Sequence, residues 1–139
     1  MKLTFIYLNF PFWRAEVSRI SLFLSGIEFD NKVVLSDEFQ RVKAAGRLDD
    51  GTVIPHHQLP CLIVDGHPIA QTGAIARYCG KLSGLYPKNN DLLAAQIDQV
   101  LDLATDITVL VSTTANAVTG RMNNDQNNLE REKRYLMEN

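Results

Sequence analysis

The chain has 139 residues, of which 45% are hydrophobic, and its formal net charge is −2. This balance is typical of soluble domains, and the lack of a basic surplus argues against nucleic acid as a partner. Two cysteines without a Cys-x-x-Cys motif are too few for a disulfide framework and argue against thioredoxin-type redox exchange. We therefore expect a reduced, cytoplasmic setting, with Cys61 and Cys79 packed as small apolar groups.

The first residues predict a strand, a helix and a second strand. Residues 3–8 are an apolar run typical of a buried strand. They continue into a loop that holds Asn9 and Pro11 and has no small-residue cleavage site, so we do not expect a secretory signal. Residues 15–25 predict a helix that ends at Gly26, and 29–35 alternate as a strand. The prediction of this helix depends on three apolar residues at helical spacing: Val17, Ile20 and Leu24. A unit of this length implies parallel pairing of its two strands.

A second helix and a hairpin follow. Residues 36–45 predict a short helix with Ser36 as its N-cap, and 46–57 an extended polar loop. Two apolar runs flank Asp65-Gly66, which is the strongest short-range signal of a β-hairpin. The chain is therefore expected to turn back at this point.

Two features around the hairpin predict a ligand site. Pro60, at the first residue of a strand, leaves Leu59 extended with its backbone available to a ligand. Gln71 and Thr72 precede a helix expected over residues 74–82, with Thr72 as its cap, and the free amides there favour a carboxylate. Each feature alone has an ordinary structural role. Together, in this order, they predict a site for an amino-acid-like anion.

The C-terminal part is expected to be helical. Residues 83–91 predict a linker, after which apolar residues recur at steps of four and three. These residues are Leu93, Ile97, Val100, Ala104, Ile107 and Val111. Residues 119–128 are polar and predict an interruption, and 129–139 the start of another helix. No run approaches the roughly 20 apolar residues of a membrane span.

Several ordered motifs carry a family resemblance. They are Tyr7, Arg14-Ala15-Glu16, Gln58-Leu59-Pro60, Gln71-Thr72 with Ala74-Ile75, and Leu85-Tyr86-Pro87. With them, residues 1 to about 108 resemble a cytosolic glutathione transferase of the tyrosine type, similar to the sigma and alpha classes. The resemblance implies an α/β fold, with a thioredoxin-like glutathione-binding domain over 1–83. Residues 84–139 would form the first helices of an all-α domain that is incomplete, because family members continue through several more helices.

The resemblance also implies catalytic roles for two residues. Glutathione's thiol has a pKa near 8.5 and reacts as the thiolate, which a neutral phenol with a pKa near 10 can stabilise by a hydrogen bond. Tyr7 is assigned that donor role; the alternative is a core aromatic residue. Arg14 would add positive potential near the thiolate, and the alternative is an ordinary pair with Glu16.

The remaining expected contacts to glutathione come from several segments: Lys43, Gln58, Leu59, Pro60, Gln71, Thr72 and Asp106. Lys43 stands four residues after Phe39, which replaces the tryptophan found in the sigma class; a solvated lysine is the alternative. Asp106 matches an aspartate that reaches glutathione in the other subunit of alpha-class dimers, which implies a homodimer. Its alternative is a wet helix face shared with Asp98 and Asp102.

The expected function is therefore conjugation of glutathione to electrophilic small molecules, a detoxification reaction with glutathione as co-substrate and with neither a separate cofactor nor a metal. Two alternatives stay open. One is a glutathione-dependent isomerase. The other is a non-catalytic glutathione-binding protein or a crystallin-like structural relative.

Overall fold

The computed structural model describes the backbone of residues 1–10 and 13–138 and the side chains of residues 1–10 and 13–120. The chain divides into two compact units, Met1–Leu101 and Asp102–Asn139. The sheet and its helices belong to the first unit, and the second consists of the later part of one long helix. The domain boundary expected after residue 83 stays a prediction.

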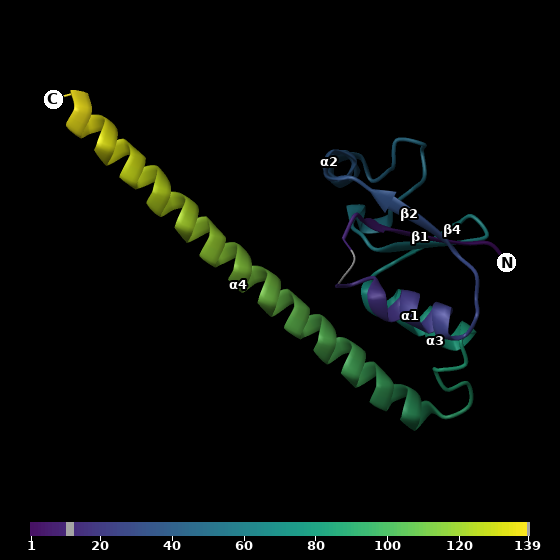
Figure 1. Cartoon of the computed structure of the whole chain (residues 1–139). Coiled ribbons are helices and arrows are strands. Elements are labelled where there is room, and N and C mark those ends of the chain that lie inside the picture. The colour runs from purple at the N-terminus through teal and green to yellow at the C-terminus, as the bar shows by residue number, and fades with distance from the viewer. Residues whose placement is uncertain (11–12, 139) are drawn as a thin grey trace. The chain divides into compact units, whose positions relative to one another are not determined.

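The first unit has a four-stranded mixed sheet in the order β2-β1-β3-β4. Its elements, in chain order, are β1 (Leu3–Leu8), α1 (Glu16–Leu24), β2 (Asp30–Val34), α2 (Ser36–Ala45), the 3₁₀ turn η1 (Pro55–His57), β3 (Cys61–Val64), β4 (His67–Ala70), α3 (Thr72–Leu82) and the start of α4 (Asp91–Glu138). β1 pairs parallel with β2 and antiparallel with β3, and β4 pairs antiparallel with β3. Figure 1 shows α1 and α3 on one face of the sheet and α2 on the other. The expected thioredoxin-like fold is confirmed.

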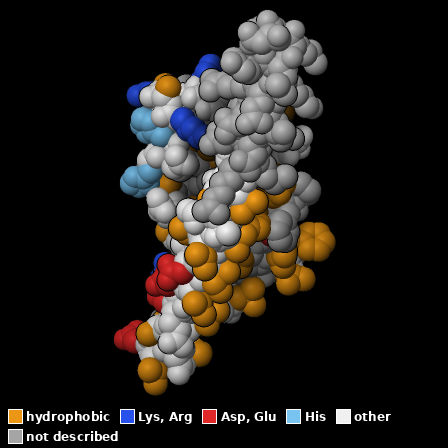
Figure 2. All heavy atoms as spheres, turned by 90° about the vertical axis from the view of Figure 1, so that its left-hand side faces the viewer, with side chains coloured by type: hydrophobic (Ala, Val, Ile, Leu, Met, Phe, Trp, Pro, Cys, Tyr) orange, Lys and Arg blue, Asp and Glu red, His pale blue; other side chains and the backbone are white. Residues whose placement is uncertain are grey.

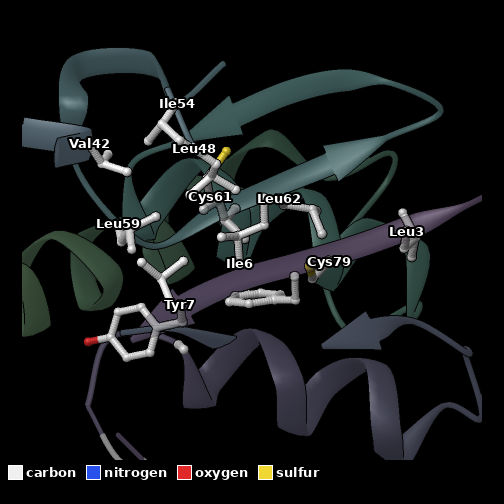
Figure 3. Packing of buried hydrophobic residues seen from close by; sticks show 14 of the residues in the cluster. Leu3, Ile6, Tyr7, Val42, Leu48, Ile54, Leu59, Cys61, Leu62 and Cys79 are labelled. Atoms are coloured by element: carbon white, nitrogen blue, oxygen red, sulfur yellow. The ribbon is translucent and has the colours of Figure 1, made fainter. Parts of the chain in front are cut away.

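The core of this unit lies between the sheet and its helices. Figure 3 shows buried side chains from β1, β3, α2 and the loop before β3 gathered in one cluster. Phe5 is fully buried and meets Phe29 edge to face, with the ring centroids 6.4 Å apart. Each apolar side chain buried in this way contributes about 1.5–3 kcal/mol. The central strand β1 therefore has a fixed position, which matters for Tyr7 near its end.

The apolar residues that predicted α1 are on its exposed face. Val17, Ile20 and Leu24 are exposed, whereas the residues α1 buries are Ser18, Ser21 and Leu22. α1 packs beside α3, and small serines allow a close approach. The Ser21 hydroxyl donates to the Ser18 carbonyl at 2.9 Å, which satisfies a buried polar group. The helix itself and its stop at Gly26, where φ is 64°, are confirmed.

β2 is an edge strand, and it does not bury the set of alternating residues that contains most of the apolar side chains of the predicted strand. Val34 is fully buried, while Val33 and Leu35 are 43% and 62% exposed. Spacing alone favoured burial of the set with Val33 and Leu35, because that set contains more apolar residues than the set with Val34. The predicted strand and its parallel pairing with β1 are confirmed.

The hairpin of β3 and β4 has the predicted turn. Asp65 and Gly66 both have positive φ, 47° and 86°, as a type I′ turn requires. Val64 faces His67 across this turn. The Asp-Gly signal and the two apolar runs beside it therefore predicted the hairpin correctly.

Two predicted helix caps are wrong. Ser36 and Thr72 are the first helical residues, and the N-cap positions belong to Leu35 and Gln71, neither of which makes a side-chain cap hydrogen bond. Leu35 is extended and α2 begins at Ser36, whereas a helix with Ser36 as its N-cap would begin one residue later. α3 begins two residues earlier than expected because the chain reverses at Gln71, where φ is 75°.

α4 is one continuous helix of 48 residues, so the expected interruption over 119–128 is wrong. A glycine or asparagine costs at most about 1 kcal/mol in a helix interior, and no proline follows Pro87 to end it. The expected apolar stripe is present. Figure 2 shows hydrophobic side chains along one side of the described length of α4, and Leu93, Val100 and Ile107 of the stripe are exposed. None of the helices in the described residues is both long and apolar enough to cross a bilayer.

Candidate functional site

A pocket of about 230 Å³ brings together six of the residues that the sequence analysis singled out. Its lining consists of Arg14, Gln58, Leu59, Pro60, Gln71 and Thr72. They come from the segment before α1, the segment that enters β3, and the start of α3. Residues far apart in the sequence thus meet at one end of the sheet.

The wall before β3 has a buried side and an exposed side. Leu59 is 9% exposed, and Pro60 is buried. Gln58 is extended and exposed, and the Leu59–Pro60 peptide bond is cis. The Leu59 side chain therefore anchors the segment in the core beside the pocket that this residue helps to line.

The second wall is the start of α3. Gln71 precedes the helix with φ 75° and ψ 123°, a conformation that residues other than glycine seldom adopt. The Ile75 amide donates to the Gln71 carbonyl at 3.0 Å, which closes the first helical turn. The amides of residues 72–74 precede this bond and are the free donors of a helix N-terminus. They favour an anion next to Gln71 and Thr72.

Tyr7 lies near the end of β1, and its ring is part of the buried cluster, with the residue 4% exposed. Its hydroxyl points away from the cluster (Figure 3). Burial raises the pKa of Tyr7, whereas a hydrogen bond from the Arg14 backbone and the positive charges of Arg14 and Arg19 lower it. The net shift is upward, so Tyr7 is a neutral hydrogen-bond donor at neutral pH. Its ring packs in the core as the alternative expected, and its hydroxyl is directed outward.

Three of the predicted site residues do not line the pocket. Tyr7 is one of them. Lys43, on α2, places its Nζ 4.6 Å from the centroid of the Phe39 ring on the same helix. Asp106 is exposed on α4 in the second unit. The roles of Lys43 and Asp106 in glutathione binding stay predictions.

Arg19 is a charged group beside Tyr7 that the sequence analysis missed. It lies over the ring of Tyr7, with its guanidinium carbon 5.7 Å from the ring centroid. The one local signal was Glu16, three residues earlier on the predicted helix, because opposite charges at this spacing are neighbours. That signal indicates a helical ion pair and carries no information about a contact with β1.

Asp98 is a second charged group whose surroundings the sequence analysis missed. Expected on a wet helix face, it accepts hydrogen bonds from Arg77 at 2.5 Å and from the Tyr86 hydroxyl at 3.0 Å. The Arg77 guanidinium holds the pKa of Asp98 below its usual range. Arg77 and Asp98 are 21 residues apart, so no local spacing could have predicted their pairing.

Comparison with known proteins agrees with the geometry. The family model described as "Glutathione S-transferase, N-terminal domain" matches residues 3–81. The chain is 29% identical over 92 residues to Glutathione S-transferase 3 of Caenorhabditis elegans, a match that covers 66% of this chain and 40% of the relative. It is 28% identical over 95 residues to S-crystallin 2 of Enteroctopus dofleini, covering 68% and 40%.

A solved structure shows the same fold. Monomeric Na-GST-3, a glutathione S-transferase from the hookworm Necator americanus, superimposes with a TM-score of 0.64 at 29% identity, over 76% of this chain and 47% of that one. The chain thus spans less than half the length of each of these three proteins. With the family model matched over more than half of its residues, the chain belongs to the glutathione S-transferase family.

Proposed function

We propose that this chain binds glutathione in the pocket at the start of α3 and ionises its thiol through Tyr7 for transfer to an electrophile. The observation that carries the proposal is the pocket itself, which joins six of the nine predicted site residues. Because the chain spans less than half of its relatives, the activity of this chain is part of the proposal.

The pocket suits the two polar ends of a peptide. The free amides of α3, with Gln71 and Thr72 beside them, would bind a carboxylate of the ligand. The Leu59 backbone would pair with the peptide group of glutathione, and Gln58 is exposed beside it. Arg14 adds a positive charge to the same lining, which favours an anionic ligand.

Tyr7 would then stabilise the thiolate. A neutral phenol donates its proton in a hydrogen bond to sulfur, and each unit removed from the thiol pKa is worth about 1.4 kcal/mol. The raised pKa of Tyr7 keeps the phenol protonated at neutral pH, so the donor is present when the thiol ionises. The proton of the thiol leaves to solvent, and the thiolate forms a carbon–sulfur bond with the electrophile. The electrophile either releases a leaving group with its bonding electrons or, where a double bond opens, takes up a proton from solvent.

Calorimetric titration with glutathione tests this reaction step. Titrations at neutral pH in buffers of different ionisation enthalpy measure both affinity and the number of protons released. The unmodified chain is expected to bind saturably and to release protons. Tyr7→Phe keeps the ring and removes the donor, so binding is expected to persist while proton release is lost. Arg41→Met, on the exposed side of α2, is a matched control expected to behave as the unmodified chain.

Two outcomes would contradict the proposal. Absence of glutathione binding to the unmodified, folded chain would refute the site assignment. Equal proton release by the unmodified chain and Tyr7→Phe would refute the role of Tyr7.

A second candidate is a non-catalytic glutathione-binding or crystallin-like protein. It is favoured by the similarity to S-crystallin 2, whose identity to this chain is within one percentage point of that of Glutathione S-transferase 3. Saturable binding without proton release in the unmodified chain would support this candidate over the transferase.

The partners and location of the chain are part of the same proposal. Homodimers would place Asp106 of one copy near glutathione of the other, and a cytoplasmic location would supply reduced glutathione. Sedimentation gives the oligomeric state of the chain with and without Asp106→Ala, and calorimetric titration gives the glutathione affinity of each; the two measurements together test the first of these. A change in glutathione affinity confined to a dimeric species would support it, and an unchanged affinity would contradict it.

A further inference from the structure

The side chain of Arg19, a residue of α1, extends over two aromatic rings of β1. Its side chain is 15% exposed, and its guanidinium carbon is 5.3 Å from the Phe5 centroid and 5.7 Å from the Tyr7 centroid. Phe5 and Tyr7 are two residues apart on one strand, so their side chains are on the same face of the sheet. One cation is therefore within cation–π range of both rings.

The hydrogen bonding of Arg19 is incomplete. Its Nη1 donates to Glu16 Oε1 at 2.8 Å, and both residues belong to α1. Its Nε is buried and has no hydrogen-bond partner among the residues that the structure describes. A buried donor without a partner lowers stability, so packing on the two rings alone would favour an apolar side chain. The position of this arginine therefore calls for an explanation beyond packing.

The charge of Arg19 acts on the Tyr7 phenol. The charged groups that act on Tyr7 are Arg14 before α1, and Arg19 and Glu16 on α1. Burial is the largest influence and raises the pKa of Tyr7; the two arginines lower it, and Glu16 raises it. Arg19, which lies over the face of the ring, thus lowers the Tyr7 pKa that burial raises, and Glu16 acts against this effect of Arg19.

We propose that Arg19 is a positioning residue for Tyr7. The guanidinium of Arg19 holds the phenol ring of Tyr7 by stacking and strengthens the Tyr7 hydroxyl as a hydrogen-bond donor to the sulfur of glutathione. The part that concerns glutathione rests on the proposed function. The coupling between Arg19 and Tyr7 does not, because it is a property of the chain without ligand.

Four variants test the coupling. Arg19→Met removes the charge and keeps a long apolar stem, and Arg19→Lys keeps the charge and loses the planar group. Glu16→Gln removes the opposing charge with little change of shape. Arg41→Met is the matched control, because it removes an arginine of α2 that pairs with the carboxylate of Asp49 in the loop after that helix. The readout is ultraviolet titration of the Tyr7 phenol in the ligand-free chain, with Tyr7→Phe subtracted to remove the other tyrosines.

The expected shifts have opposite signs. Arg19→Met is expected to raise the pKa of Tyr7 and Glu16→Gln to lower it, with Arg41→Met unchanged and Arg19→Lys between Arg19→Met and the unmodified chain. With glutathione bound, the ionised fraction of its thiol at a fixed pH below the midpoint is expected to fall roughly fivefold in Arg19→Met. That factor corresponds to a cation–π contribution of about 1 kcal/mol.

The same Tyr7 pKa in the folded unmodified, Arg19→Met and Glu16→Gln chains would overturn the proposal. If Arg19→Met does not fold, Glu16→Gln decides, because Glu16 is more exposed than Arg19 and its replacement leaves the rings packed. A chain that shows both Tyr7 shifts and binds no glutathione would refute the proposed function and leave the positioning of Tyr7 by Arg19 in place.

Discussion

Gln71 offers a test of whether the pocket depends on an unfavourable backbone. Its φ of 75° and ψ of 123° are seldom adopted by residues with a Cβ atom. Gln71→Ala and Gln71→Gly both remove the side chain, but only glycine relieves the backbone. We expect both variants to lose affinity for glutathione and Gln71→Gly to be the more stable of the two.

The size of the difference follows from two opposing effects. A residue held in such a conformation costs about 1–3 kcal/mol. Gln71→Gly removes this cost, but it gives back about 0.4–1 kcal/mol, because a glycine increases the conformational freedom of the unfolded chain. The expected net advantage of glycine over alanine is about 1 kcal/mol. With a urea dependence of about 2 kcal/mol per M, this moves the unfolding midpoint by roughly 0.5 M.

Urea unfolding followed by the fluorescence of Trp13, the single tryptophan, measures this difference in the first unit. Helix N-caps prefer glycine to alanine even without strain, so a control is needed. Leu35→Gly and Leu35→Ala supply it, because Leu35 is the N-cap of α2 with an ordinary φ of −80°. If the glycine advantage at position 71 is no larger than at position 35, the backbone at Gln71 is not strained.

Further predictions concern a helix end and the buried thiols. Gly46→Ala is expected to destabilise the chain by about 2 kcal/mol, because φ is 67° and the new Cβ would lie 2.6 Å from His57 Nε2. Gly26→Ala, with φ of 64° and open space, is expected to cost about 1 kcal/mol, and equal losses in urea unfolding would show that His57 moves aside freely. Cys61 and Cys79 are fully buried, and burial raises the pKa of each to about 11. A disulfide reagent should therefore label them only as fast as the chain opens, and rapid labelling of the native chain would contradict their burial. Because their folded pKa is raised, their contribution to stability is complete below about pH 8.5 and declines as the pH rises toward 11.

Local signals in the sequence predicted the elements well. The apolar run of β1, the helix of residues 36–45 and the Asp65-Gly66 hairpin depend on short-range preferences, and the structure has all three. The pocket lining was also predictable in large part, because the residues before β3 and at the start of α3 lie close to the hairpin in sequence.

The remaining features depend on tertiary contacts. Ser18 and Ser21 are buried in α1 because of its neighbour α3, and residue type alone favoured the apolar Val17 and Ile20 for the core. The positive φ of Gln71 moved the start of α3, and a glutamine carries no signal for that conformation. The Arg19 contact with Tyr7 joins a helix to a strand, so it could be identified only once the two elements had been placed together.

The three segments that line the pocket have a consequence for how the chain acquires its ligand. Arg14, Leu59 and Gln71 are brought together only after β1 has paired with β3 and the hairpin has closed. A partly folded chain therefore has no complete binding site, and any ligand that occupies the pocket binds the native state alone. At a ligand concentration about 100 times its dissociation constant, such selective binding adds about 2.7 kcal/mol to the free energy of unfolding. For a chain of marginal stability, the supply of ligand during synthesis would then govern how much of the protein escapes degradation.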